Sequence, residues 1–437
     1  MIRTTTHHFG KDLNEGKSLE VSTFVDAYAE AVGHCVSWLW GVVLIWGKEN
    51  ERLWNRGAGA LDCPSMISTT DIGYEGHISG RALKCAATQA CGIVRAVSEK
   101  KRRDVSKGKW YVSKGREVPK RLQERIDKEM TLPDVASGTV RCELNSICCD
   151  IVDDGRHFDK WVQLQSLWSS EEQEHERGFL IRVPVKMHRR ALKWQREGLL
   201  KPSILLSKDH LCLRWESEEP AKLQEGGTLA IDQGLVDALT VSDGQKSVKS
   251  LHAHDLRSIV EKLARKRKGS KGFRRTQQHR ENYVNWAVRQ LNLTGVKELK
   301  LEDIEHITYG RRVSRRMGHW TNTLIRDALA KRCEEEGVLL TLVRCEYNSQ
   351  RCSACGWVRK ANRKGKVFRC DNPSCRECGK EVDADANAAQ NILIRDTLFP
   401  LPRGLRSLRP NLKGFFWIPE GLFWASGQEL TVPGTQS

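Results

Sequence analysis

The sequence predicts a multidomain α/β protein, and three observations lead to this prediction. Apolar residues recur at three- and four-residue spacing over about 21–137, which is typical of helices. Short alternating runs bounded by turn residues follow between about 138 and 217 and predict strands. In the remaining half, strands and helices follow one another around a cysteine cluster. The length of 437 residues fits two or three domains.

Composition narrows the class of protein. Hydrophobic residues make up 39%, too many for a disordered chain. Lys and Arg number 72 against 55 Asp and Glu, a formal charge of +17 that favours a polyanionic partner, nucleic acid above all, over a merely solvated basic surface. We expect neither a membrane span nor a signal peptide, and hence a cytoplasmic protein. Fifteen cysteines, an odd number with paired C-x-x-C spacing, favour metal over disulfides in a reducing compartment.

The N-terminal half divides by pattern into two predicted domains and a linker. Residues 1–20 and 138–217 form a β-rich domain, and 21–137 form a helical domain. The helical domain ends in a basic stretch, KGKWYVSKGREVPKR, in which Trp110 and Tyr111 interleave with charge. Such a stretch can hold phosphates while aromatic rings stack on bases, although a solvated loop with one buried Trp fits equally well. Residues 218–227, rich in Glu and Gly, form the linker.

The C-terminal half has a recognisable order of elements. TLAID and the run after its Gly turn predict two strands, and SVKSLHA a third; a basic helical stretch follows from about 255 to 291. VKELKLEDI is a strand, HWTNTLIRDALAKRCEEEG a helix ended by Gly337, and VLLTLVRCEY another strand. The cysteine cluster and a last helix, ANAAQNILIRD, complete the order of an RNase H-like fold, over 228–345 and 381–399. The tail, 400–437, has no predicted function and could be disordered or dock on a groove.

Three acidic residues stand at the ends of apolar segments. Asp232 ends TLAID, Glu302 ends ELKLE, and Asp385 begins the last helix. Carboxylates in such a set can hold two Mg²⁺ or Mn²⁺ ions, which hydrolyse a phosphodiester. Each acid alone is more often a turn former or an N-cap, so the prediction depends on all three together.

Neighbouring acids compete for these roles, and periodicity alone does not decide between Glu302 and Asp303. Asp237 and Asp383 are the other candidates. Gly234 permits the sharp turn after Asp232.

Five cysteines lie within 352–378, whereas a tetrahedral zinc site needs four. Cys352 with Cys355, and Cys375 with Cys378, have C-x-x-C spacing, so we predict these four as structural Zn²⁺ ligands in a ribbon over 346–380. Cys370 is predicted to be the spare cysteine, with the alternative that it displaces Cys375. The ribbon would then fix the start of the last helix and, through it, Asp385.

The motifs AIDQG, LEDI, SQRCSACG and CGKEVDADANAAQNI resemble those of the TnpB transposon-encoded nucleases and the compact type V CRISPR effectors, over about 228–396. This resemblance implies an RNA-guided DNA endonuclease with one RuvC-like site at Asp232, Glu302 and Asp385, in which base pairing reads the target and the protein reads a short flanking motif. It also implies a wedge domain (1–20 and 138–217), a recognition lobe (21–137), and as partners a guide RNA, double-stranded target DNA and its displaced strand, bound by a monomer or a homodimer.

Basic and aromatic residues are the predicted nucleic-acid contacts. They are Lys101, Arg102, Arg103, Lys109, Trp110, Arg265, Lys266, Arg267, Arg274, Arg275, Arg311 and Arg312. Two other functions remain open from the sequence: a guided DNA-binding repressor without cleavage, and a guide-independent resolvase or transposase.

Overall fold

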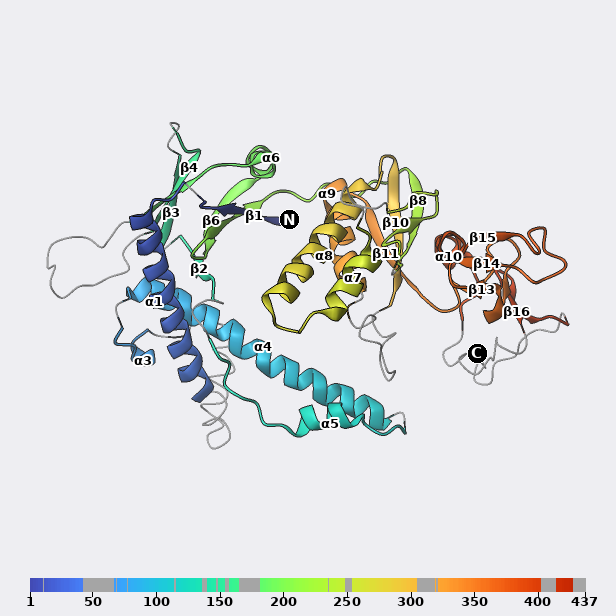
Figure 1. Cartoon of the computed structure of the whole chain (residues 1–437), viewed down its shortest axis with the longest axis horizontal. Coiled ribbons are helices and arrows are strands. Elements are labelled where there is room, and N and C mark those ends of the chain that lie inside the picture. The colour runs from blue at the N-terminus through green and yellow to red at the C-terminus, as the bar shows by residue number, and fades with distance from the viewer. Residues whose placement is uncertain are drawn as a thin grey trace. The chain divides into compact units, whose positions relative to one another are not determined.

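A computed structural model of the chain divides it into two compact units, Met1–Glu218 and Glu219–Ser437, shown in Figure 1. The structure describes all residues except 11, 42–66, 68, 77, 114, 136–139, 147, 154–156, 165–180, 235, 248–253, 305–318, 320, 402–413 and 427–437. The predicted mixed α/β class is confirmed. Within the described residues, no helix is long and apolar enough to cross a membrane.

Two long helices pack against each other in the first unit. Helix α1 (Glu15–Trp40) begins at Asn14, whose side chain accepts a hydrogen bond from the Lys17 amide, and its apolar positions are buried against α4 (Gly80–Ser113). Two shorter helices, α3 (Thr69–Ile72) and α5 (Lys120–Asp127), contact α4. Helix α5 is tied to it by Arg125, whose guanidinium donates two hydrogen bonds of 2.9 Å to Asp104.

The first unit also holds two antiparallel sheets. One has the order β1-β7-β6-β2, and its strands are β1 (Ile2–His8), β7 (His210–Glu216), β6 (Leu199–Leu206) and β2 (Cys142–Leu144). The other has the order β3-β4-β5, with β3 (Cys149–Asp153), β4 (Lys160–Leu164) and β5 (Ile181–Val185). Helix α6 (Arg189–Glu197) precedes β6. Strand β1 alternates exposed and buried residues, as expected of a strand with one face on the core.

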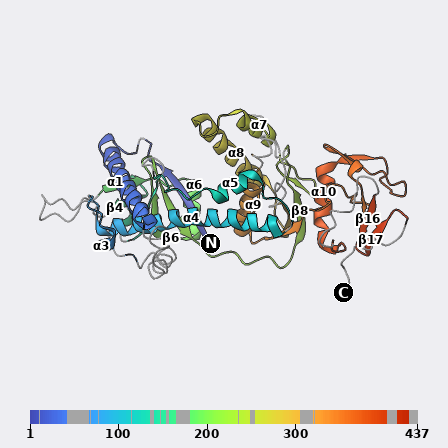
Figure 2. The same ribbon diagram turned by 90° about the horizontal axis from the view of Figure 1, so that it is seen from below.

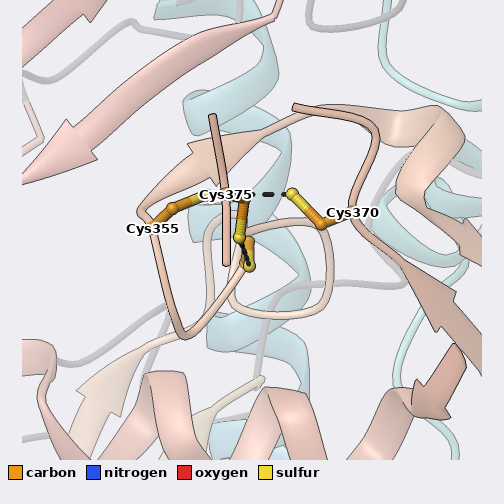
Figure 3. Close-up of side chains that lie close together, drawn as sticks. Cys355, Cys370 and Cys375 are labelled. Atoms are coloured by element: carbon orange, nitrogen blue, oxygen red, sulfur yellow. Dashed lines mark hydrogen bonds between the residues drawn. The ribbon is translucent and has the colours of Figure 1, made fainter. Parts of the chain in front are cut away.

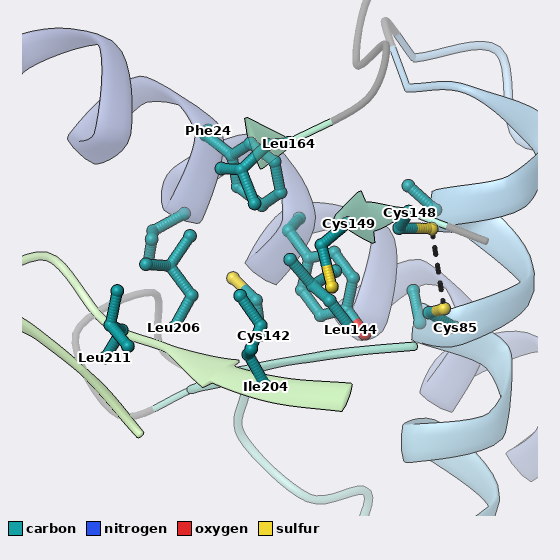
Figure 4. Packing of buried hydrophobic residues seen from close by; sticks show 14 of the residues in the cluster. Phe24, Cys85, Cys142, Leu144, Cys148, Cys149, Leu164, Ile204, Leu206 and Leu211 are labelled. Carbon is teal, nitrogen blue, oxygen red and sulfur yellow. Dashed lines mark hydrogen bonds between the residues drawn. The ribbon is translucent and has the colours of Figure 1, made fainter. Parts of the chain in front are cut away.

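The sheets and α1 share one apolar core. Figure 4 shows Phe24 of α1 beside Leu164, and Leu144, Ile204 and Leu206 on neighbouring strands. Cysteines outside the zinc prediction were expected to act as small buried apolar residues, and Cys142, Cys148 and Cys149 are indeed buried there.

The second unit is built on a sheet of order β11-β10-β8-β9. Strands β8 (Gly227–Asp232), β10 (Val296–Asp303) and β11 (Leu339–Arg344) run parallel, and short β9 (Thr240–Val241) runs antiparallel to β8. Because the strands are parallel, their carboxyl ends meet at one edge. The third predicted strand, SVKSLHA, lies largely outside the described residues.

Helices cover this sheet. The basic helical stretch predicted over 255–291 is two helices, α7 (Leu256–Arg265) and α8 (Lys271–Gln290), which lie side by side in both views (Figure 1 and Figure 2). The break comes at Gly269, with a φ of 83°, and at Ser270, whose hydroxyl accepts from the Phe273 amide. Helix α9 (Asn322–Glu336) ends at Gly337 in the left-handed region, as predicted, and α10 (Ala384–Leu393) packs on β8.

Two small sheets follow the main one. The first joins β13 (Arg363–Lys364), β14 (Val367–Arg369) and β15 (Glu381–Asp383). The second joins β12 (Trp357–Val358), β16 (Phe415–Ile418) and β17 (Gly421–Trp424). Residues 415–424, in the predicted tail, therefore form a β-hairpin that pairs with β12, an element that the sequence analysis did not predict.

Candidate active site and metal centre

Two of the three predicted carboxylates lie at the carboxyl ends of adjacent parallel strands. The last registered pair between β8 and β10 is Ile231 with Leu301, and Asp232 and Glu302 are the next residues on each strand. Asp232 is buried, only 7% exposed, and Glu302 is half-buried. The ends of two apolar runs are thus brought together by the register of the sheet.

The third carboxylate comes from the first turn of α10. Asp385 is 3% exposed. Asp383 is the N-cap of this helix: its side chain accepts hydrogen bonds from the amides of Asp385 (2.9 Å) and Ala386 (3.0 Å) and pairs with Lys246 at 2.8 Å. The competing candidate Asp383 therefore orders the helix start, whereas Asp385 projects from it.

Gly234 brings the turn after β8 close to Asp385. A Cβ added at Gly234 would lie 2.2 Å from the carbonyl oxygen of Asp237 and 3.5 Å from Asp385 Oδ2. The lack of a side chain is needed for this close approach of backbone to carboxylate, because the first of these distances is far below van der Waals contact.

The negative charges of Glu302 and Asp385 act on Asp232. Burial, and then the negative charges of Glu302 and Asp385, raise the pKa of Asp232 well above its ordinary value. Burial raises the pKa of Glu302 to about 7, an effect that a hydrogen bond from Asn348 opposes. Carboxylate oxygens are the ligand type that hard divalent cations such as Mg²⁺ prefer, so the donor chemistry of these residues suits such a cation.

Two cations, which the sequence analysis missed, contact Asp385. Both come from the hairpin formed by β13 and β14. Arg363 Nη2 donates to Asp385 Oδ1 at 2.8 Å, and Lys366 Nζ contacts both Asp385 Oδ2 and, at 2.7 Å, Asp237 Oδ2. The competing candidate Asp237 is thus joined to Asp385 through Lys366.

A buried amide holds Glu302. Asn348 is fully buried, and its Nδ2 donates to Glu302 Oε1 at 2.8 Å. This residue, just after β11, was also missed, since only the adjacent SQRCSACG motif marked the region in the sequence.

Four cysteine sulfurs converge next to α10. Those of Cys352, Cys355, Cys370 and Cys375 all lie within 4.8 Å of one another, and Figure 3 shows three of these side chains turned toward a common centre. The exposed Cys378 lies outside this group. The structure therefore gathers Cys370, which was predicted to be spare, and leaves out Cys378, which was predicted to be a ligand.

Backbone amides also donate hydrogen bonds to these four sulfurs. The amides of Ala354 and Cys355 donate to Cys352, and those of Trp357, Asn372 and Glu377 donate to Cys355, Cys370 and Cys375 in turn. Such bonds stabilise thiolates, the form that binds metal. The backbone explains why C-x-x-C spacing does not match this grouping. Cys370 pairs with Cys378 in an isolated β-bridge, and the Gly379 amide donates to the Cys370 carbonyl. This turn places the Cys370 sulfur in the cluster and leaves Cys378 at the surface.

The cysteine cluster is tied to α10 by two asparagines of the ANAAQNI motif. The Ser353 amide donates to Asn387 Oδ1 at 3.0 Å, and Asn387 Nδ2 donates to the Arg351 carbonyl at 2.8 Å. Asn391 Nδ2 donates to the same carbonyl at 2.7 Å. The helix that carries Asp385 and the first cysteine pair are thus one connected structure.

A second group of possible metal ligands lies in the other unit. His8 and His210 face each other across β1 and β7, next to Asp209, and all three are at least partly exposed. Exposed groups of this kind are common without a bound ion, so we assign it no role.

The predicted nucleic-acid contacts differ in their surroundings. Arg102, Arg103, Lys109 and Trp110 are exposed on α4, as are Arg265, Lys266 and Arg267 at the end of α7 and Arg274 and Arg275 on α8. Lys101 instead donates to the carbonyls of Arg125, Ile126 and Lys128, which places it at the end of α5 as a capping residue. Arg311 and Arg312 lie outside the described residues.

Replacement of Gly234 by Ala tests the close approach beside Asp385. Because the added methyl overlaps the Asp237 carbonyl, we expect Gly234→Ala to destabilise the second unit by about 1–3 kcal/mol, measured by thermal unfolding. Gly272→Ala is the matched control, since its Cβ would meet only Lys266 Cδ at 3.8 Å. Equal stability of the two variants would contradict the tight turn.

Comparison with known proteins places part of this unit in a family. A model of the Cas12f1-like TNB domain matches residues 324–392, from α9 through the cysteines to α10. The chain is 33% identical over 181 residues to the CRISPR-associated endodeoxyribonuclease Cas12f1 of Sulfoacidibacillus thermotolerans, covering 40% of each chain. It is 30% identical over 160 residues to that of Syntrophomonas palmitatica, covering 30% of this chain and 31% of the relative. The matches thus span two fifths or less of these curated relatives.

The fold is similar over a larger part. The cryo-EM structure of a Cas12f1-sgRNA-target DNA complex matches with a TM-score of 0.51 and 13% identity, over 87% of this chain and 83% of that one. At this identity the likeness concerns the fold alone. Taken with the domain match, it confirms the resemblance predicted from the sequence: this chain is similar to the compact type V CRISPR effectors and TnpB-like nucleases.

Proposed function

We propose that the protein is an RNA-guided DNA endonuclease with a single RuvC-like active site at Asp232, Glu302 and Asp385. The observation that carries this proposal is the meeting of three carboxylates, from two parallel strands and one helix, at one edge of a sheet. The similar proteins named above are endodeoxyribonucleases, and the similar structure is a complex with guide RNA and target DNA.

The reaction is hydrolysis of a phosphodiester of the target strand or of its displaced partner. Two Mg²⁺ or Mn²⁺ ions, when bound, would activate the attacking water and stabilise the leaving oxygen. Asp232, Glu302 and Asp385 would supply the oxygen ligands. Arg363 and Lys366 now pair with Asp385. When a metal ion binds this carboxylate instead, their guanidinium and ammonium groups would be free to contact a phosphate oxygen of the substrate.

We further propose that Cys352, Cys355, Cys370 and Cys375 bind one structural Zn²⁺. The group consists of four cysteine sulfurs, which would fill all four positions of a tetrahedral zinc ion. Such a closed site leaves no position for water or substrate, so it has no catalytic role. Its role is positional, because the same loop holds α10 through Asn387 and Asn391.

The guide RNA and the target DNA are the proposed partners of both units. In the first unit, the two antiparallel sheets would form the wedge domain and the helices would form the recognition lobe. In the second, exposed Arg and Lys from Arg265 to Arg275 would contact phosphates. Sequencing of the RNA that co-purifies with the chain would identify the guide.

Loss of one carboxylate should abolish cleavage. We expect Asp232→Asn to cut DNA at least about 10³-fold more slowly than wild type, because it removes a charged ligand at the centre of the site. The assay uses the chain with its co-purified RNA, and target binding by the variant is the control. Undiminished cutting would contradict the assignment. If the wild-type protein binds the target DNA tightly but does not cut it, the protein is a repressor. If the purified protein contains no RNA, it is a guide-independent enzyme.

Zinc content distinguishes the two remaining cysteines. We expect Cys378→Ser to retain about one zinc ion per chain and Cys370→Ser to lose it, measured by elemental analysis of the purified full chain. The reverse result would restore the ligand set predicted from the sequence.

Salt dependence tests the basic surface. Replacement of Arg265, Lys266, Arg267, Arg274 and Arg275 by Gln should reduce the slope of log affinity for RNA against log salt by about 3, if these side chains contact phosphates. Unchanged circular dichroism is the control for folding. An unchanged slope would show that this surface is only solvated.

A further inference from the structure

The C-terminal hairpin, residues 415–424, is built into the second unit. Strand β16 pairs with β12 through Phe416 with Trp357 and Phe415 with Val358. Trp417 is 1% exposed, and its Nε1 donates to the Phe399 carbonyl at 2.7 Å. This hairpin therefore has a fixed position beside the cysteine cluster and α10.

Trp417 contacts two buried arginines. Its ring lies over the guanidinium of Arg395, which is 4.1 Å from the ring centroid, and its carbonyl oxygen accepts a hydrogen bond from Arg351 Nε at 2.8 Å. A cation over an indole face is attracted by the ring, and more so when both are shielded from water. Arg395 is only 8% exposed, so its stacking on Trp417 is shielded from water.

Arg395 in turn orients Asn348. Arg395 Nη1 donates to Asn348 Oδ1 at 3.2 Å, and the same guanidinium contacts both the carbonyl and the carboxylate of Glu346. A guanidinium has donors and no acceptor, so the side of the Asn348 amide that faces it must be the oxygen. The amide nitrogen then faces the other way, toward Glu302 Oε1 at 2.8 Å.

These contacts form a chain from the hairpin to the active site. We propose that Asn348 and Arg395 are positioning residues that hold the carboxylate of Glu302 for metal binding, and that the C-terminal hairpin acts on the active site by holding Arg395 through Trp417. This inference rests on the proposed nuclease function. It gives the hairpin a role in that function, although none of its residues touches a carboxylate of the site.

Metal affinity and stability should respond differently to changes at Asn348. In Asn348→Asp the shape is kept and the bond from Arg395 is strengthened, but a second carboxylate faces Glu302. In Asn348→Ala these two bonds are lost, together with the one that Asn348 Nδ2 donates to the Arg344 carbonyl at 3.1 Å, and a cavity is left. If Asn348 served stability alone, the Asp variant would lose less than the Ala variant both in unfolding temperature and in metal affinity. If it positions Glu302, the Asp variant should bind metal no better than the Ala variant while unfolding at a higher temperature.

The experiment is a titration of the zinc-loaded full chain, free of RNA, with Mn²⁺ followed by electron paramagnetic resonance. Binding that Asp232→Asn abolishes is counted as binding at the active site. We expect Asn348→Asp and Asn348→Ala each to weaken this binding by about tenfold or more. We expect Trp417→Leu to weaken it severalfold, and Trp424→Leu, on the other strand of the same hairpin, to leave it within about twofold of wild type.

Further variants keep the test decisive. Trp417→Phe keeps an aromatic face over Arg395 and should bind Mn²⁺ as wild type does; if Trp417→Leu fails to fold, Arg395→Met replaces it and should show the same loss. Zinc content and thermal unfolding verify the fold of each variant. Mn²⁺ affinity of Asn348→Asp equal to that of wild type, or equal losses in the two Trp→Leu variants, would overturn the inference. If wild type itself lacks the Asp232-dependent binding, the proposed function fails instead.

Discussion

Repulsion of the buried Asp232 carboxylate by the negative charges of Glu302 and Asp385 is the constraint on which the proposed site depends. Burial and these two charges raise the pKa of Asp232 well above its ordinary value, so that its ionised form is costly. A protein can keep such a cluster only if other parts of the chain hold each carboxylate in place. Here Asp232 is held by the sheet register, Glu302 by Asn348, and Asp385 by the start of α10 and two cations of the β13–β14 hairpin.

The same constraint explains why the small sheets surround the site. The cysteine loop is pinned to α10 through Asn387, and the hairpin at 415–424 extends that loop through β12. Arg363 and Lys366 come from the segment between the cysteine pairs. The region that would bind zinc thus supplies both the support for Asp385 and the positive charge beside it.

The sequence predicted those features that depend on local pattern. Asp232 and Glu302 end apolar runs, and parallel strands of one sheet bring such ends together, so their meeting could be foreseen. Gly337 as a helix end follows from the same kind of local signal. The motifs also led to a resemblance that the domain match over 324–392 bears out.

Features that depend on contacts between distant segments could not be predicted in this way. C-x-x-C spacing favoured Cys378, whereas backbone pairing with Cys370 decides which sulfurs converge. Lys366 meets Asp237, 129 residues away in the sequence, and no spacing rule connects them. The hairpin did carry a local signal, a Pro-Glu-Gly turn between aromatic runs, which the sequence analysis did not use.

The most direct test of the central claim is to locate metal in the active site. A crystal structure of the zinc-loaded chain soaked in Mn²⁺, with anomalous scattering data, would provide it. We expect anomalous density between Asp232, Glu302 and Asp385, with Lys366 displaced from Asp385. Absence of such density, with Lys366 still joining Asp237 to Asp385, would contradict the assignment of these carboxylates as a catalytic metal site.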